Sequence, residues 1–224
     1  MKKLLIATLA SIGFFSVVSA DIGVKLGFSA MMGEYEATGF EIEDTDDTSA
    51  KAKEKALIPM GSIFIEKSLG FLPGPLARLS VGYDKVMHKL STGTRDTGRV
   101  SNTTLILGTV VNQKVSAEFD NIDTIYATFN FTDWLYVRAG NISMDVKTTE
   151  SLGTGSTYGD TSLDGTVMGF GVEKSSDNGM FWRAEYTDTD VDGVKLVSSK
   201  NTTTSVTLDG IDGTAYKLSI GKAF

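Results

Sequence analysis

The sequence of 224 residues contains no cysteine, only three prolines and a single histidine. Without cysteine the chain can form neither a disulfide framework nor a thiolate metal site. With one histidine, any histidine-based catalysis depends on His88 alone. Glycine is abundant at 24 positions, and threonine, serine and valine are frequent. This composition favours strands and turns over helices.

Long apolar runs are also scarce, and the only one is at the N-terminus. The run from Leu4 to Val18 follows two lysines, and Val18-Ser19-Ala20 supplies the small residues of a cleavage site. The run is on the short side of the roughly 17–25 residues that span a membrane as a helix. We therefore predict a cleavable signal peptide over residues 1–20 and one mature domain over residues 21–224.

The balance of charge is acidic. Removal of Lys2 and Lys3 with the signal peptide reduces the 21 basic residues to 19 against 28 acidic ones, a net charge of about −9. A negative surface is repelled by phosphate backbones, so nucleic acid is excluded as an expected partner.

The last eleven residues have a strict period of two. Tyr216, Leu218, Ile220 and Phe224 fall on one face, and small or polar residues fall on the other. The mature chain has no apolar run of helix length, so a membrane role requires a closed sheet, in which every backbone donor and acceptor is paired. We predict that this segment is the closing strand of an all-β, antiparallel, up-and-down transmembrane barrel.

Seven further segments alternate in the same way, which gives eight strands. The predicted strands are residues 22–33, 56–68, 77–87, 123–131, 134–140, 166–174, 180–187 and 214–224. Short turns are predicted at 70–75, 132–133 and 175–179, and long polar loops at 34–55, 88–103, 145–164 and 188–213, with a short helical turn considered at 49–56. Short turns at one end and long loops at the other are typical of outer-membrane barrels.

One segment leaves the number of strands open. Residues 104–111 and 115–131 are both strand-like, which is too long for a single membrane crossing. We interpret the first part as a strand that extends above the bilayer within the loop. The alternative is an extra hairpin, which would give ten strands.

Taken together, the signal peptide, the aromatic residues near strand ends and the terminal Phe224 resemble the small outer-membrane β-barrel family that includes the opacity-type adhesins of Gram-negative bacteria. Lys222 departs from the apolar residue usual there, although its long side chain can reach the interface. The resemblance implies insertion by the outer-membrane assembly machinery through the C-terminal strand, an outer-membrane location and a surface-exposed loop end.

Charged residues at alternate positions are predicted to face the lumen. The set comprises Arg78, Asp84, Arg138, Glu173, Arg183 and Glu185. The interior of an eight-stranded barrel is just wide enough to be filled by side chains, so opposed arginines and carboxylates can pair there. We favour a salt-bridge network that plugs the lumen, and the alternative is the lining of an ion-selective pore.

The segment Asp188-Thr189-Asp190-Val191-Asp192-Gly193 resembles the start of a calcium loop, where alternate oxygen ligands precede a glycine. The twelfth position is Ser199 and not glutamate, so a solvated acidic loop is the competing interpretation. The acidic run 41–47 has the same two interpretations, a soluble loop or cations that bridge to lipopolysaccharide phosphates.

His88 has Asp84 and Ser91 near it in sequence, but nothing in the spacing forms a nucleophile and base. We therefore expect no enzyme and no cofactor. Four aromatic residues are predicted as membrane-interface anchors: Trp134, Trp182, Tyr216 and Phe224.

The expected function is a monomeric, non-enzymatic barrel in contact with outer-membrane lipid and lipopolysaccharide. It would display polar loops for adhesion, surface interaction or envelope structure. The alternative is a narrow porin-like channel for small solutes or ions.

Overall fold

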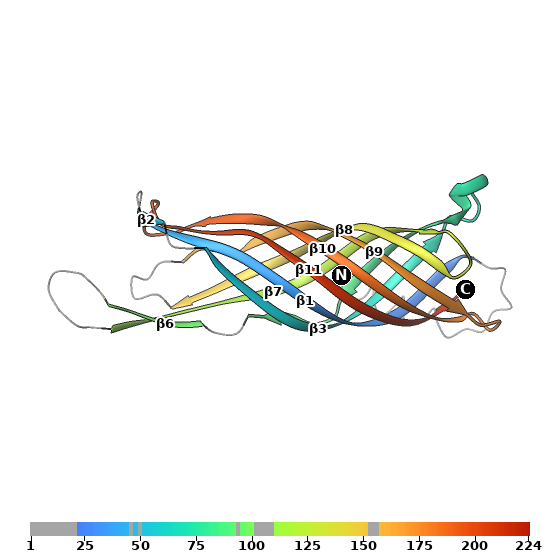
Figure 1. Ribbon diagram of the computed structural model, residues 1–224, viewed down its shortest axis with the longest axis horizontal. Helices are drawn as coiled ribbons and strands as arrows, with labels where there is room; N and C mark the ends of the chain where they lie inside the picture. Colours follow the sequence, from blue (N-terminus) through green and yellow to red (C-terminus); the bar gives the residue numbers. More distant parts are fainter. Residues whose placement is uncertain (1–21, 45–46, 49–50, 93–94, 101–109, 152–156) are drawn as a thin grey trace, which may run out of the picture.

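The computed structural model describes residues 22–44, 47–48, 51–92, 95–100, 110–151 and 157–224, and the predicted signal peptide therefore lies outside the described residues. Eight long strands form a closed antiparallel barrel (Figure 1). They are β1 (Val24–Asp44), β3 (Ala52–Ser68), β4 (Leu79–Val86), β7 (Val110–Asn130), β8 (Leu135–Ser151), β9 (Thr161–Ser175), β10 (Met180–Val197) and β11 (Ser205–Ala223). The all-β, eight-stranded, outer-membrane-type barrel predicted from the sequence is confirmed.

The barrel closes between its first and last strands. β1 pairs with β3 on one side and with β11 on the other. At the end of this seam the Val24 N–H donates to the Phe224 carbonyl at 3.2 Å, and the Phe224 N–H donates to the Val24 carbonyl at 2.8 Å. The prediction that the C-terminal segment is the closing strand is confirmed.

Four short elements complete the described fold. They are β2 (Asp47–Thr48), β5 (Leu90–Ser91), β6 (Arg95–Val100) and the 3₁₀ helix η1 (Gly74–Arg78). β5 and β6 pair with β7 and so continue the place that β4 holds in the ring. The ten-stranded alternative is therefore wrong. Of the strand-like segment 104–111, residues 110–111 belong to β7 and residues 104–109 lie outside the described part. Among the described residues, no helix has the length and apolar character to cross a membrane.

The strands are staggered around the ring. Paired residues can be followed from Pro59 on β3 through Met32, Tyr216, Tyr186, Phe170, Val137 and Phe129 to Leu79 on β4. Leu79 accepts a hydrogen bond from the Leu69 N–H, so one circuit ends ten residues beyond its start. A stagger of this size goes with strands tilted by about 35–45° to the barrel axis and with a narrow interior.

All the barrel strands except β4 have 15–21 residues and are longer than the roughly 9–11 residues of a membrane crossing, which corrects the four predicted long loops. Most of 34–55 belongs to β1 and β3, parts of 88–103 to β5 and β6, parts of 145–164 to β8 and β9, and most of 188–213 to β10 and β11. The described part of the considered helical turn at 49–56 enters β3 as an extended strand. Polar residues on the outer face of a strand do not indicate a loop where that face is in water, so the predicted loop boundaries are wrong.

The reason is an inversion of polarity along each strand. On β10 the outward residues are apolar from Trp182 to Tyr186 and acidic from Asp188 to Asp192, while the inward residues change from Arg183 and Glu185 to threonine and valine. The period of two continues without interruption. Only the medium outside changes, from hydrocarbon to water.

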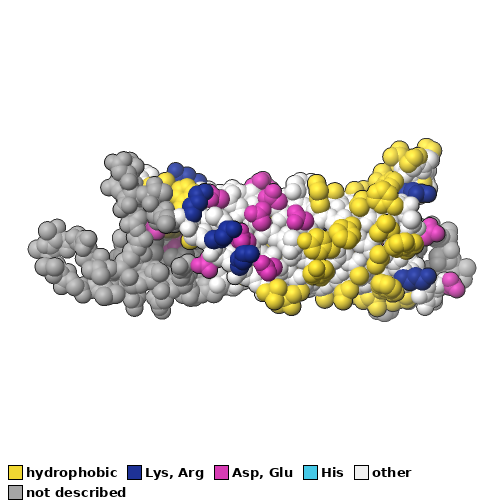
Figure 2. All heavy atoms as spheres, in the orientation of Figure 1, with side chains coloured by type: hydrophobic (Ala, Val, Ile, Leu, Met, Phe, Trp, Pro, Cys, Tyr) yellow, Lys and Arg dark blue, Asp and Glu magenta, His cyan; other side chains and the backbone are white. Residues whose placement is uncertain are grey.

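We call the part of the barrel from the short turns up to the outward residues Met32, Ile125, Ala139, Met168, Tyr186 and Tyr216 the girdle half, and the part beyond them the distal half. Figure 2 shows hydrophobic side chains over the half that carries η1 and charged side chains beyond them. The girdle is the surface that a transmembrane barrel presents to lipid.

The distal half has the core of a barrel that stands in water. Its buried apolar residues point inward and are Met60, Val86, Ile122, Met144, Val146, Leu163 and Val191. Outside, Lys53 and Lys55 on β3 pair with Glu36 on β1. The hydrogen bond from Lys53 lowers the pKa of the Glu36 carboxyl. The expectation of a barrel that is oily outside and polar inside therefore holds only for the girdle half.

Candidate functional site

The lumen of the girdle half contains a network of charged side chains. Among the described residues its members are Lys25, Glu66, Asp84, Arg138, Glu173, Arg183, Glu185 and Lys217. Each lies on the inward phase of its strand, where the apolar outer face leaves only the lumen for polar side chains. Four cations face four carboxylates, so the formal charges balance. The network consists of two clusters, and the ion pairs within each cluster share residues.

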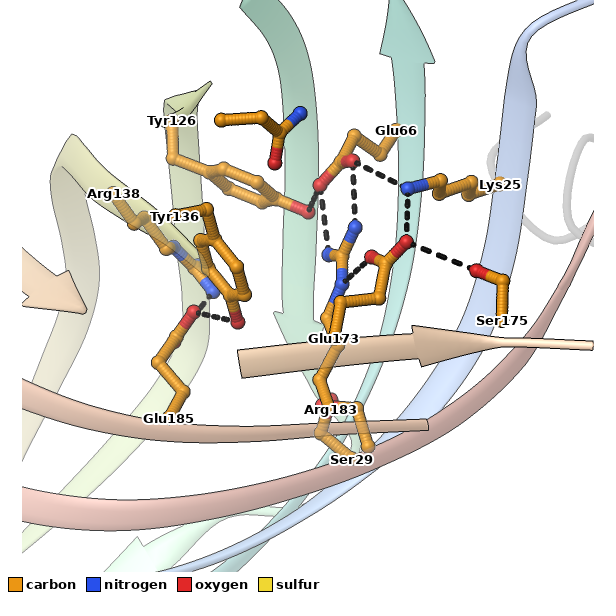
Figure 3. Close-up of polar contacts among 12 residues, drawn as sticks. Lys25, Ser29, Glu66, Tyr126, Tyr136, Arg138, Glu173, Ser175, Arg183 and Glu185 are labelled. Carbon is orange, nitrogen blue, oxygen red and sulfur yellow. Dashed lines mark hydrogen bonds and ion pairs between the residues drawn. The ribbon is translucent and has the colours of Figure 1, made fainter. Parts of the chain in front are cut away.

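The first cluster is centred on Arg183 of β10 (Figure 3). Its Nη1 and Nη2 donate to the Glu66 carboxylate at 2.8 and 2.7 Å, and its Nε donates to Glu173 Oε2 at 2.6 Å. Lys25 Nζ donates to the other oxygen of Glu173 at 2.6 Å. The Tyr126 hydroxyl donates to Glu66 at 3.3 Å. Every charge has a hydrogen-bonded partner, as burial requires.

The second cluster joins Arg138 of β8 to two carboxylates. Arg138 Nη1 donates to Glu185 at 3.2 Å, and its Nη2 lies 3.6 Å from Asp84 Oδ2. The Tyr136 hydroxyl donates to the other Glu185 oxygen at 2.8 Å, and Lys217 Nζ donates to Asp84. All of these side chains are buried.

Aromatic rings fill the space between the clusters. The Arg138 guanidinium lies 3.7 Å from the centroid of the Tyr126 ring. The Tyr126 ring lies directly over Gly82, where an added Cβ would be 2.3 Å from the ring. Tyr136 covers Gly171 in the same way, with its hydroxyl oxygen and Cζ 2.7 Å from the position of an added Cβ. Glycine at these inward positions makes room for rings that cross the lumen.

Five of the six residues predicted for the lumen network lie in it: Asp84, Arg138, Glu173, Arg183 and Glu185. The placement of Arg78 in the lumen is wrong. Arg78 ends η1 before the β4 ladder begins, is exposed, and donates from Nη1 to the Phe131 carbonyl of the neighbouring turn at 2.8 Å.

Three members were not among the predicted set: Lys25, Glu66 and Lys217. Each lies at the inward phase of its strand, in step with small or polar residues such as Gly27 and Ser219. The sequence signal for these three residues is that they occupy the same alternate positions as the small and polar residues of their strands. It identifies residues that face the lumen, but it gives no contacts between strands.

The predicted calcium loop is a strand. Asp188, Asp190 and Asp192 lie in β10 and all three are exposed on its outer face. Asp188 and Asp192 are about 13 Å apart along the strand, so the three carboxylates cannot converge on one cation. Asp190 lies directly opposite Asp212 of β11. Within the described ranges, no group of three or more metal-ligating side chains is present, and the calcium-loop hypothesis is therefore wrong. In the acidic run 41–47, the side chains of residues 43–47 lie outside the described part.

The structure separates the residues that were considered for histidine catalysis. His88 is exposed in the bend between β4 and β5, whereas Asp84 is buried in the lumen and bonded to Lys217. The arrangement does not assemble the general base and orienting carboxylate that such chemistry needs.

The four aromatic residues predicted as interface anchors all lie on the outside. Trp134 is exposed in the turn before β8, Trp182 and Tyr216 are exposed on the girdle, and Phe224 is partly exposed at the barrel seam. Tyr216 packs against Tyr186 at a ring centroid distance of 5.4 Å. Their role as anchors stays a prediction.

At the loop end, two connections are joined to each other. The Ser199 N–H donates to the Thr157 carbonyl at 2.9 Å, and the Thr157 N–H donates to the Ser199 hydroxyl at 3.0 Å. The Tyr158 hydroxyl donates to Glu41 of β1 at 3.5 Å. These hydrogen bonds hold the β8–β9 and β10–β11 loops to each other and to β1 at the rim of the barrel.

Comparison with known proteins gives similarity of structure alone. No protein-family model matches the chain, and no curated protein matches it. Among solved structures, the outer-membrane protease OmpT from Escherichia coli has a TM-score of 0.44 at 10% identity, with 93% of this chain and 99% of that chain covered.

Two further solved structures are also similar. Ail, the attachment invasion locus protein of Yersinia pestis, has a TM-score of 0.32 at 12% identity, with 85% of this chain and 98% of that chain covered. Neisserial surface protein A has a TM-score of 0.35 at 11% identity, with 88% of this chain and 97% of that chain covered. At these identities and TM-scores the three similarities give no information on the function of this chain.

Proposed function

We propose that this protein is an outer-membrane β-barrel of a Gram-negative bacterium that displays its distal half at the cell surface for adhesion, surface interaction or envelope structure. The girdle half would lie in lipid with the short turns towards the periplasm. The distal half, with its polar outer face, would stand above the membrane. It would act by contact, with neither catalysis nor a cofactor.

One observation carries this proposal: the lumen is blocked at the level of the girdle, while the outside becomes charged beyond it. Arg183 and Arg138 reach across the interior to paired carboxylates, and tyrosine rings occupy the space between them. We expect a narrow barrel filled in this way to have no continuous aqueous path. The surface that remains for function is the distal exterior and its loops.

The absence of cysteine makes a direct test of orientation possible. Thr203 is exposed in the β10–β11 connection, and Asp177 is exposed in the short turn before β10. Intact cells that express Thr203→Cys should react with a membrane-impermeant maleimide. Cells that express Asp177→Cys should react only after the outer membrane is permeabilised. Labelling of Asp177→Cys alone on intact cells would reverse the orientation and remove the proposal.

Adhesion is tested on the same cells. Replacement of residues 199–203 by glycines removes the exposed side chains of the tip, including the Ser199 hydroxyl that accepts from the Thr157 N–H. Attachment to host-cell or abiotic surfaces should fall for this variant at equal surface expression. A variant with the opposite turn 176–178 replaced by glycines is the control and should attach normally. Equal attachment by both variants and by cells without the protein would argue against adhesion.

The alternative is a narrow channel for ions or small solutes, because charged residues line the lumen. Planar bilayers with the wild-type protein should show no stepwise single-channel current. Removal of both partners in the double variant Glu66→Ser, Arg183→Ser should open a path and produce steps. Wild-type steps that are abolished by a change at Arg138 would establish the channel and remove the plugged barrel.

The partners implied by this location remain part of the proposal. They are lipid around the girdle, lipopolysaccharide at the outer leaflet, and the assembly machinery that recognises the C-terminal strand. We expect a monomer, because the closed ring leaves no strand edge to pair with another copy.

A further inference from the structure

The distal half of the barrel contains an apolar chamber directly above the lumen network. It has a volume of about 110 Å³. Its walls come from strands around the ring, with Met60 on β3, Ile122 on β7, Met144 on β8 and Val191 on β10. These side chains are at most 8% exposed. The chamber is therefore an interior space, and it lies outside the girdle.

The chamber has a polar floor. Arg138, Lys217 and Asp84 line it from below, and they also belong to the lumen network. A single chamber thus has a hydrocarbon wall and one end that offers hydrogen-bond donors. That combination is characteristic of a site for a small molecule with an apolar body and a polar atom at one end.

Arg138 supplies a donor that the protein does not use. Its side chain is 6% exposed, and its Nε–H is buried without a hydrogen-bond partner. The other end of the same guanidinium is bonded to Glu185. A buried donor without a partner costs about 1–3 kcal/mol, so an acceptor atom of a ligand would relieve that cost.

The size and charge of the site limit the ligand. An apolar cavity of about 150 Å³ remains dry and binds benzene, so a chamber of 110 Å³ suits a molecule smaller than an aromatic ring, such as a short chain. Arg138 and Lys217 already face Glu185 and Asp84 in equal number. An ionised ligand would leave one charge unbalanced in a buried place, and an uncharged ligand would not.

We infer that this chamber binds a small uncharged molecule with a short apolar chain, such as a four-carbon ketone, whose oxygen accepts a hydrogen bond from Arg138. The ligand would enter the half of the barrel that lies outside the membrane. This binding is separate from the proposed surface display, because its residues face inward and the displayed residues face outward.

The experiment uses the full mature barrel in lipid nanodiscs, with empty nanodiscs subtracted to remove partition into lipid. The probes are butanone and its hydrocarbon counterpart 2-methylbut-1-ene, each labelled with carbon-13 and followed by NMR. The wild type should bind the ketone saturably, with one molecule per barrel and at least tenfold more tightly than the hydrocarbon. Absence of saturable binding would overturn the inference.

Two variants fill the chamber and one matched variant does not. Val191→Phe and Val167→Phe place a ring inside it, and each should weaken ketone binding at least tenfold. Val81→Phe makes the same change on the lipid-facing side and should leave binding unchanged. Heat-modifiable gel migration identifies the variants that have folded. Normal binding by a folded filling variant would place the site elsewhere and refute the inference.

The double variant Arg138→Met, Glu185→Met tests recognition of the oxygen. It removes the guanidinium donors together with the carboxylate that they pair with, so the preference for the ketone over the hydrocarbon should disappear while the hydrocarbon still binds. Retention of the preference would show that Arg138 does not recognise the oxygen, and that part of the inference would fail.

Discussion

Glu66 on β3 and Arg183 on β10 meet inside the barrel through two hydrogen bonds of 2.8 and 2.7 Å. Between these strands in the ring lie β1 and β11, so the pair connects separate parts of the wall. The carboxylate of Glu66 is buried, and its partner is shared with Glu173. We therefore expect this pair to stabilise the closed barrel.

Glu66→Gln should destabilise the barrel by about 3–5 kcal/mol, because it leaves Arg183 buried without its bidentate carboxylate. Urea unfolding from detergent, followed by tryptophan fluorescence, measures the change. Glu34→Gln is the matched control, since Glu34 makes an exposed pair with Lys55 at 3.2 Å. Its cost should remain below about 1 kcal/mol. Equal costs for the two variants would contradict the assignment of the network as structural.

Gly82→Ala should destabilise the barrel by about 1–3 kcal/mol, because the added methyl group would meet the Tyr126 ring and shift it within the filled lumen. Gly61→Ala is the control: the nearest atom, the Ser29 carbonyl oxygen, is 3.9 Å from an added Cβ. That variant should unfold at nearly the wild-type urea concentration. A tolerant Gly82 would show that the Tyr126 ring has room to move.

On β10 the girdle ends between Tyr186 and Asp190, so we expect Tyr186 to contact lipid and Asp190 to contact water. With both native tryptophans replaced by phenylalanine, a new tryptophan at Tyr186 should be quenched by brominated lipid. A new tryptophan at Asp190, four residues further along the same face of β10, should not be. The two positions are about 13 Å apart along the strand. Similar quenching at both positions would mean that the distal half is also in hydrocarbon.

Asp190→Asn should raise stability by up to about 0.5 kcal/mol, because Asp190 lies opposite Asp212 and like charges on paired strand positions repel. Calcium should not change the unfolding midpoint of the wild type. The check is urea unfolding with millimolar calcium or with a chelator. A calcium-dependent gain in stability that Asp190→Asn abolishes would restore the cation-site hypothesis.

The sequence predicted the class of fold and the phase of the residues that face the lumen. Arg138 and Glu185 could be assigned to the interior because the outward residues beside them, such as Val137 and Tyr186, are apolar. Arg78 was misplaced by the same rule, since a period of two was continued past the first paired residue into η1. Periodicity gives the direction of a side chain only where the backbone is a strand.

The length of the strands could not be predicted from hydropathy. Asp188, Asp190 and Asp192 were interpreted as loop because acidic residues do not face lipid, but their neighbours Thr189 and Val191 face an apolar core. Where the barrel leaves the membrane, its strands still alternate, but the polar residues now face outward and the apolar residues face inward. The reversal follows from the change of solvent, and a rule for membrane strands alone misses it.

The sequence by itself determined that the chain forms a closed antiparallel barrel, because alternation and the lack of an apolar helix leave no other way to pair every backbone group in lipid. Only the tertiary structure decided which charges meet. Glu66 and Arg183 are 117 positions apart, and the stagger of the ring brings them to the same level. The same stagger places Met60, Ile122 and Val191 around one chamber, since contacts across a lumen depend on how the strands close and not on any local pattern.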